Sequence, residues 1–141
     1  MKQNNKKYKI YGTDIYCSSK SEARVGEWLK MEGYSFLHDR KYPYEDINKN
    51  YRYDFMILNK SDKSEEIKTK YHIYIEVKEN IKEVDEMLEE KDFVEEHGDV
   101  LITFYDDELI ENVFREKLKL ARKILDLQNE NRILKIELHK K

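Results

Sequence analysis

The chain of 141 residues contains little cysteine, proline or glycine, and each shortage excludes a class of protein. Its single cysteine, Cys17, excludes an internal disulfide framework and a cysteine-ligated zinc site. One proline and four glycines exclude collagen-like and flexible low-complexity chains. No apolar stretch approaches the roughly 20 residues that cross a bilayer, and the polar N-terminus is not a signal peptide. We therefore expect a soluble, cytoplasmic protein with no membrane partner.

Charged and aromatic side chains are abundant, at 40% and 12% of the residues, and the net charge is -3. The apolar residues fall into periodic runs, so we expect a folded, highly charged domain and not a disordered chain. Basic residues outnumber acidic ones before residue 79 and after residue 112, whereas residues 79–112 are strongly acidic. A phosphate-binding surface is therefore expected on the first or the last of these three blocks.

The hydrophobic pattern predicts a mixed α/β fold. Ser19 and Glu22 have the spacing of a capping box, so a helix begins there and ends near Gly33. After it the pattern predicts three strands, an acidic helix, a fourth strand and a long helix, over residues 34–43, 51–57, 71–78, 81–97, 100–105 and 107–141. The three sequential strands suggest a meander, and the following helix a crossover to a neighbouring fourth strand. We divide the chain into an α/β core, 1–106, and a C-terminal helix, 107–141.

The same pattern predicts which side chains are buried. Strand 51–57 places alternate side chains on one face, namely Tyr51, Tyr53, Phe55 and Ile57. The first helix is expected to bury Val25, Trp28, Leu29 and Met31, and the acidic helix Val84, Met87, Leu88, Phe93 and Val94. A polar loop, 59–70, is expected to join the second and third strands.

Four charged residues form the most informative constellation: Glu22, Asp54, Glu76 and Lys78. If strands 51–57 and 71–78 pair, the carboxylates of Asp54 and Glu76 can lie close together. Two carboxylates and a backbone carbonyl such as that of Val77 make a hard-oxygen site that suits Mg²⁺ or Mn²⁺. Such an ion lowers the pKa of bound water and stabilises a phosphodiester under attack, with Lys78 able to assist.

The order of Glu22 on a helix, Asp54 on a strand and Glu76-x-Lys78 on the next strand resembles the PD-(D/E)XK nuclease superfamily. The stretches YRYDF and YIEVK carry the resemblance, and the form of the motif is similar to very-short-patch-repair-like and phage-type endonucleases. It implies a restriction-endonuclease-like core and Mg²⁺- or Mn²⁺-dependent hydrolysis of DNA. It also implies that Asp54 and Glu76 are metal ligands, Lys78 the catalytic lysine and Glu22 the helix acid. Tyr53 stands where the name-giving proline would be.

Simpler interpretations remain beside this one. Glu22 fits a helix cap, and Glu76 with Lys78 fits a charge pattern on a half-solvated sheet. His38 and His97 have no metal-ligand spacing to each other. Arg40, Lys41 and Arg52 are candidates for contacts with a nucleic-acid backbone. The same chemistry on RNA, or a catalytically silent binding and dimerisation module, are the alternative functions.

The C-terminal helix carries a heptad repeat. Ile110, Lys117, Ile124, Asn131 and Leu138 recur at position a, and Val113, Leu120, Leu127 and Leu134 at position d. This predicts a homodimer through residues 110–138. Additional apolar residues, Leu118, Leu125, Ile133 and Ile136, favour the alternative of a long helix packed across its own sheet.

Overall fold

The computed structural model describes residues 7–44, 51–58, 72–78, 84–106 and 111–139. Within them the predicted order of helix, three strands, helix, strand and helix is present, preceded by a short hairpin that the sequence analysis does not anticipate. The predicted loop 59–70 lies outside the described residues. The elements are β1 (Tyr8–Lys9), β2 (Tyr16–Cys17), α1 (Lys20–Met31), β3 (Phe36–Lys41), β4 (Arg52–Ile57), β5 (Ile73–Lys78), α2 (Val84–Glu96), β6 (Val100–Tyr105) and α3 (Glu111–His139).

The main sheet has the strand order β3-β4-β5-β6. Neighbours β3 and β4, and β4 and β5, are antiparallel, which confirms the predicted meander. Strand β6 pairs in parallel with β5, as a connection through a helix requires. The mixed α/β class is therefore confirmed. In the described part of the chain, no helix is long and apolar enough to cross a bilayer.

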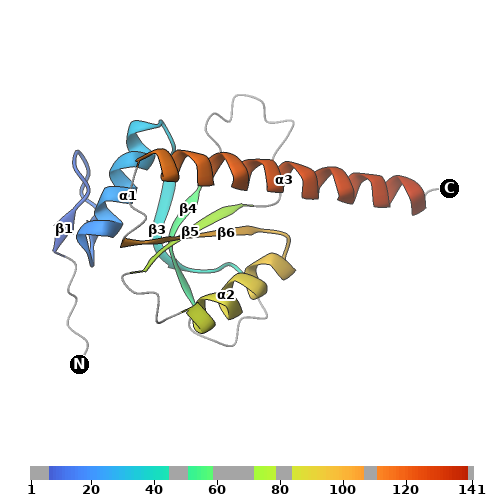
Figure 1. The fold of residues 1–141 in the computed structure, drawn as a ribbon, viewed down its shortest axis with the longest axis horizontal. Helices are drawn as coiled ribbons and strands as arrows, with labels where there is room; N and C mark the ends of the chain where they lie inside the picture. The colour runs from blue at the N-terminus through green and yellow to red at the C-terminus, as the bar shows by residue number, and fades with distance from the viewer. Residues whose placement is uncertain (1–6, 45–50, 59–71, 79–83, 107–110, 140–141) are drawn as a thin grey trace.

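Helices cover both faces of this sheet (Figure 1). One apolar cluster joins α1 and α3 to side chains of the sheet that include Phe55, Ile75 and Phe104. A second cluster on the opposite face joins Met87 and Val94 of α2 to tyrosines of the sheet. The parallel strand β6 contributes to both clusters, which explains its nearly unbroken apolar run.

Local signals fix both ends of α1. The Ser19 hydroxyl accepts a hydrogen bond of 3.1 Å from the Glu22 backbone N–H, as the predicted N-cap requires. At the other end Gly33 has φ +84°, and the N–H groups of Gly33 and Tyr34 donate to the carbonyls of Lys30 and Leu29. This pair of bonds is the Schellman motif, which explains why a glycine follows the helix.

Replacing Ser19 by alanine should lower the free energy of unfolding by about 1 kcal/mol, because one N–H in the first turn of α1 loses its acceptor. Chemical denaturation measures the change. Ser21→Ala, in the same turn, is the matched control and should leave the stability nearly unchanged. An equal loss in both variants would contradict the cap.

Two predicted burials and one predicted strand face are wrong. Met31 is 75% exposed at the last turn of α1, and Leu88 is 53% exposed on α2. The buried stripe of α2 runs instead through Met87, Glu90 and Val94, and Glu90 is tolerated there because the Tyr42 hydroxyl donates to it at 2.7 Å. The third error is the assignment of Tyr53 to the face of Phe55 and Ile57.

Tyr53 belongs to the α2-side cluster, whereas Phe55 belongs to the opposite one. The alternation of β4 therefore breaks at Asp54. The regular pairing of β4 with β5 reaches only to Phe55, opposite Ile75. On the neighbouring strand Asp39 has φ +51°, between residues whose partners are Phe55 and Tyr53. The sheet is thus irregular at the position of Asp54.

The first half of helix α3 follows the predicted alternative of a long helix packed across its own sheet. It packs on the sheet through Phe114, Leu118, Ala121 and Leu125, so this part of 107–141 belongs to the same core as the strands. The heptad residues Leu120, Ile124 and Leu127 are 58%, 38% and 55% exposed. The helix then extends well past the sheet (Figure 1). Packing within the chain therefore leaves these a and d side chains exposed to solvent. We call this row of side chains the heptad seam.

Candidate functional site

Asp54 lies where β4 and β5 part. One residue beyond the last regular pair, its Oδ2 accepts a hydrogen bond of 2.7 Å from the backbone N–H of Val77. Val77, whose carbonyl was predicted as a metal ligand, thus contributes its N–H to Asp54. Because Val77 follows Glu76 directly, this bond holds the Asp54 carboxylate against the strand that carries Glu76 and Lys78.

Glu76 is almost completely buried, with 4% of its surface exposed. The Lys78 ammonium lies 3.6 Å from its Oε2. The other oxygen, Oε1, is buried and has no hydrogen-bond partner among the described residues. A buried carboxylate oxygen without a donor is energetically costly, so this position favours a bound cation or a proton.

The pKa values of both carboxyl groups are raised. For Asp54 the main cause is burial, and the charge of Glu22 adds to it. For Glu76 burial is again the main cause, followed by repulsion from Asp54 and from Glu90. The Lys78 ammonium opposes both shifts but does not cancel them. The two acids therefore resist being ionised together unless further positive charge reaches them.

Glu22 points its carboxylate away from a capping interaction. Its Oε1 accepts from the Ser18 hydroxyl at 3.1 Å, and its Oε2 lies 2.7 Å from Nε2 of His38. Its charge nevertheless raises the pKa of Asp54. Glu22 is thus coupled electrostatically to Asp54, and the Ser19 hydroxyl supplies the helix cap.

The three predicted phosphate contacts lie at the same end of the sheet as Asp54. In the register of β3 and β4, Lys41 is opposite Arg52 and Arg40 is opposite Tyr53. All three basic residues are exposed. Arg52 is already engaged, because its Nε donates to a carboxylate oxygen of Asp39 at 2.9 Å. Arg40 and Lys41 are therefore the better candidates for contacts with a ligand.

The sequence analysis missed Glu90 as a neighbour of this site. Glu90 is buried on α2 and contributes to the raised pKa of Glu76. Its spacing of three residues from Met87 and four from Val94 places it on one helix face with them. This signal was present in the sequence, but an acidic residue is not expected on a buried face. His38 and Cys17 were missed as well, since their contacts join distant parts of the chain.

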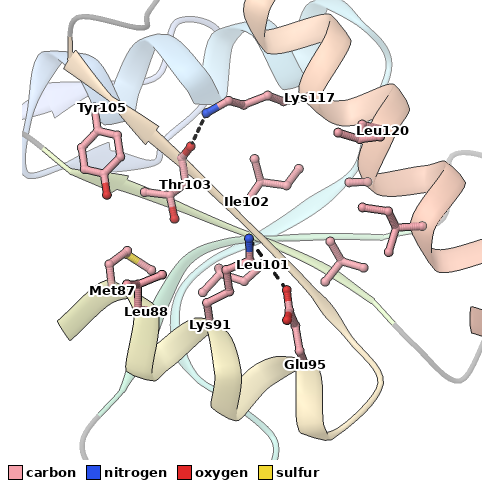
Figure 2. A pocket seen from close by; sticks show the side chains of 13 residues that line it. Met87, Leu88, Lys91, Glu95, Leu101, Ile102, Thr103, Tyr105, Lys117 and Leu120 are labelled. Atoms are coloured by element: carbon pink, nitrogen blue, oxygen red, sulfur yellow. Dashed lines mark hydrogen bonds and ion pairs between the residues drawn. The ribbon is translucent and has the colours of Figure 1, made fainter. Parts of the chain in front are cut away.

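A groove of about 330 Å³ runs beside β6, between α2 and α3 (Figure 2). Its walls are mainly apolar and include Met87, Leu101 and Leu120. The Lys117 ammonium donates to the Thr103 carbonyl at 2.8 Å across it. Thr103, which lines the groove, is paired with Glu76 on the neighbouring strand. The apolar lining of the groove does not suit a phosphate backbone.

No family model matches this chain, and no curated protein or solved structure is similar enough to it to count as a match.

Proposed function

We propose that this protein is a metal-dependent endonuclease that hydrolyses phosphodiester bonds in DNA. The observation that carries the proposal is the pairing of Asp54 with the buried Glu76, whose Oε1 has no partner among the described residues. Lys78 lies directly beside them. Two buried acids with raised pKa values and an adjacent lysine form a site arranged for chemistry more than for stability.

The donor set fits Mg²⁺ or Mn²⁺. Carboxylate oxygens are the ligands that these hard cations prefer, and a cation at Asp54 and Glu76 would relieve their mutual repulsion. When bound, such an ion activates water and stabilises negative charge on the phosphate. The requirement for positive charge therefore follows from this chain's own buried acids.

The chain's other residues have distinct tasks in this proposal. Lys78, whose side chain is 23% exposed, orients the attacking water or stabilises the phosphate charge. Glu22 acts as the helix acid next to Asp54, through the electrostatic coupling between the two groups. Arg40 and Lys41 position the nucleic-acid backbone along the exposed end of β3.

The topology supports the restriction-endonuclease-like assignment. The acids lie on the second and third strands of a meander that follows α1, and the parallel fourth strand follows α2. This is the placement that the resemblance to the PD-(D/E)XK superfamily implies. The decisive experiment is cleavage of supercoiled plasmid and of a branched DNA with Mg²⁺, Mn²⁺ or EDTA. Cutting that requires a metal supports the proposal, and well-folded protein that never cuts contradicts it.

RNA is the alternative substrate, because the basic residues contact a backbone that both nucleic acids share. Digests of RNA and DNA of equal length at matched salt separate the two, since electrostatic binding changes steeply with salt concentration. Preferred cleavage of RNA would replace DNA in the proposal without altering the site.

We further propose that the protein forms a homodimer through α3. The exposed residues Leu120, Ile124 and Leu127 occupy successive a and d positions of the heptad repeat. In a parallel pair Glu130 of one chain falls opposite Lys135 of the other, a favourable pairing that this sequence provides. Catalytic sites in two copies would suit a double-strand break or a branched substrate, whereas a monomer would nick.

Leu127→Glu should convert the dimer to a monomer, because it places a charge in the apolar seam. Light scattering coupled to size-exclusion chromatography measures the mass. The matched control is Leu88→Glu, which changes another exposed leucine outside the seam and should leave the dimer intact. A wild-type chain that elutes as a monomer at all accessible concentrations would refute dimerisation through α3.

A further inference from the structure

Three metal-ligating side chains from three elements meet beside α1. They are Cys17 of β2, Glu22 of α1 and His38 of β3, and their ligand atoms all lie within 4.8 Å of one another. The Cys17 thiol is fully buried, and the side chains of Glu22 and His38 are only 8% and 10% exposed. The fold thus gathers one sulfur, one nitrogen and one oxygen donor in a nearly closed place.

The contacts of these donors converge on one point. The same ring nitrogen, His38 Nε2, lies 2.7 Å from Glu22 Oε2 and 3.5 Å from Cys17 Sγ. The distance between His38 and Glu22 is that of a charge-assisted hydrogen bond, and the Cys17 sulfur lies against the same nitrogen. A cation between the three atoms would accept a lone pair from each of them, including the Cys17 thiolate.

The spacing is close to that of a tetrahedral site. With ordinary zinc–ligand bond lengths, neighbouring sulfur and nitrogen ligands lie about 3.6 Å apart and nitrogen and oxygen ligands about 3.4 Å apart. The first distance is already met by Cys17 and His38 at 3.5 Å. The second requires His38 and Glu22 to separate by less than about 1 Å from their present 2.7 Å.

We propose that Cys17, Glu22 and His38 form a binding site for a divalent transition cation of the zinc class, with a fourth position for water. The thiolate and imidazole donors favour Zn²⁺ or Co²⁺ over Mg²⁺. The site is therefore chemically different from the oxygen-only pair of Asp54 and Glu76, but it shares Glu22 with the proposed nuclease site, so a bound cation would also neutralise the charge of the helix acid. It revises the expectation that a single cysteine excludes a thiolate-ligated metal, because histidine and glutamate supply the remaining donors.

Co²⁺ titration of the full chain tests this site. A bound thiolate gives Co²⁺ a charge-transfer absorption band, and only Cys17 can produce it, because the chain has one cysteine. We expect a band that saturates near one equivalent of Co²⁺ and disappears when Zn²⁺ is added in excess. Cys17→Ser should remove the band, and His38→Gln should weaken binding at least roughly tenfold. His97→Gln, a histidine outside the cluster, is the matched control.

A second readout protects the test against misfolded variants. Zn²⁺ should raise the thermal unfolding midpoint of the wild-type chain and of Asp54→Asn, but not that of Cys17→Ser. Circular dichroism verifies that each variant is folded. Failure of Co²⁺ to produce a band, or a band that His38→Gln leaves unchanged, would overturn the site. Asp54→Asn separates the two proposals, because it should abolish Mg²⁺-dependent cleavage and leave the cobalt band in place.

Discussion

Asp54→Asn and Glu76→Gln are each expected to reduce metal-dependent cleavage of DNA by a factor on the order of 1,000, to the background of the assay. Each change keeps the size of the side chain and removes a charge that would hold the ion. Asparagine at position 54 also retains an oxygen that can accept the Val77 N–H, so β4 and β5 should stay joined. Nicking of supercoiled plasmid with Mg²⁺ measures the loss.

Lys78→Ala tests the catalytic lysine by the same assay and should give a comparable loss with metal binding retained. Asp92→Asn and Lys119→Ala are matched controls, since both residues are exposed, one on α2 and one on α3. They should cleave as the wild type does. Full activity in Asp54→Asn would refute the metal site, and a loss shared by the controls would point to a general defect in nucleic-acid binding.

The element order of this fold could be predicted because its signals are local. Isoleucine and valine at every second position mark β5, an unbroken apolar run marks β6, and Ser19 and Gly33 mark the ends of α1. The errors arise where tertiary contacts decide. Periodicity cannot show that β4 is irregular at Asp54, because the cause lies in the pairing with β3 and β5. It also cannot show which of two apolar stripes on α3 faces the sheet.

The candidate site was predicted in part for the same reason. Asp54, Glu76 and Lys78 lie on two neighbouring strands, so strand pairing alone brings them together. The partners of Glu22 could not be predicted, because His38 and Cys17 approach it from other elements. The capping-box spacing correctly indicated that Ser19 caps α1. For the Glu22 carboxylate the same pattern indicated the wrong partner, since a capping box directs that side chain to the N-cap N–H, whereas it contacts the side chains of Ser18 and His38.

The metal-free protein should lose stability as the pH rises from about 4, the ordinary range of a carboxyl group in the unfolded chain. Burial raises the pKa values of Asp54 and Glu76 in the folded state, and the charge of Glu22 adds to the shift at Asp54 as that of Asp54 does at Glu76. The folded chain therefore binds more protons than the unfolded chain above pH 4, and stability falls until the raised pKa values are passed. Denaturant unfolding at a series of pH values, in the presence of EDTA, measures this slope.

Glu76→Gln should remove the part of that slope that Glu76 contributes, because glutamine carries no ionisable group, whereas the part from Asp54 remains, since burial and the charge of Glu22 cause it. At pH 8 it should stabilise the metal-free chain by about 2 kcal/mol, and at pH 4 the variant and the wild type should be nearly equal. Mg²⁺ should reverse the order by stabilising only the wild type, since the ion binds the folded form with both acids present. Glu89→Gln, an exposed glutamate on α2, is the control that should change neither the slope nor the response to Mg²⁺. Equal slopes in Glu76→Gln and wild type would show that the pKa of Glu76 is not raised in the folded chain. If the slope falls as expected, one cause explains both effects of Glu76→Gln. The buried carboxylate that holds the metal for cleavage also lowers stability when no metal is bound.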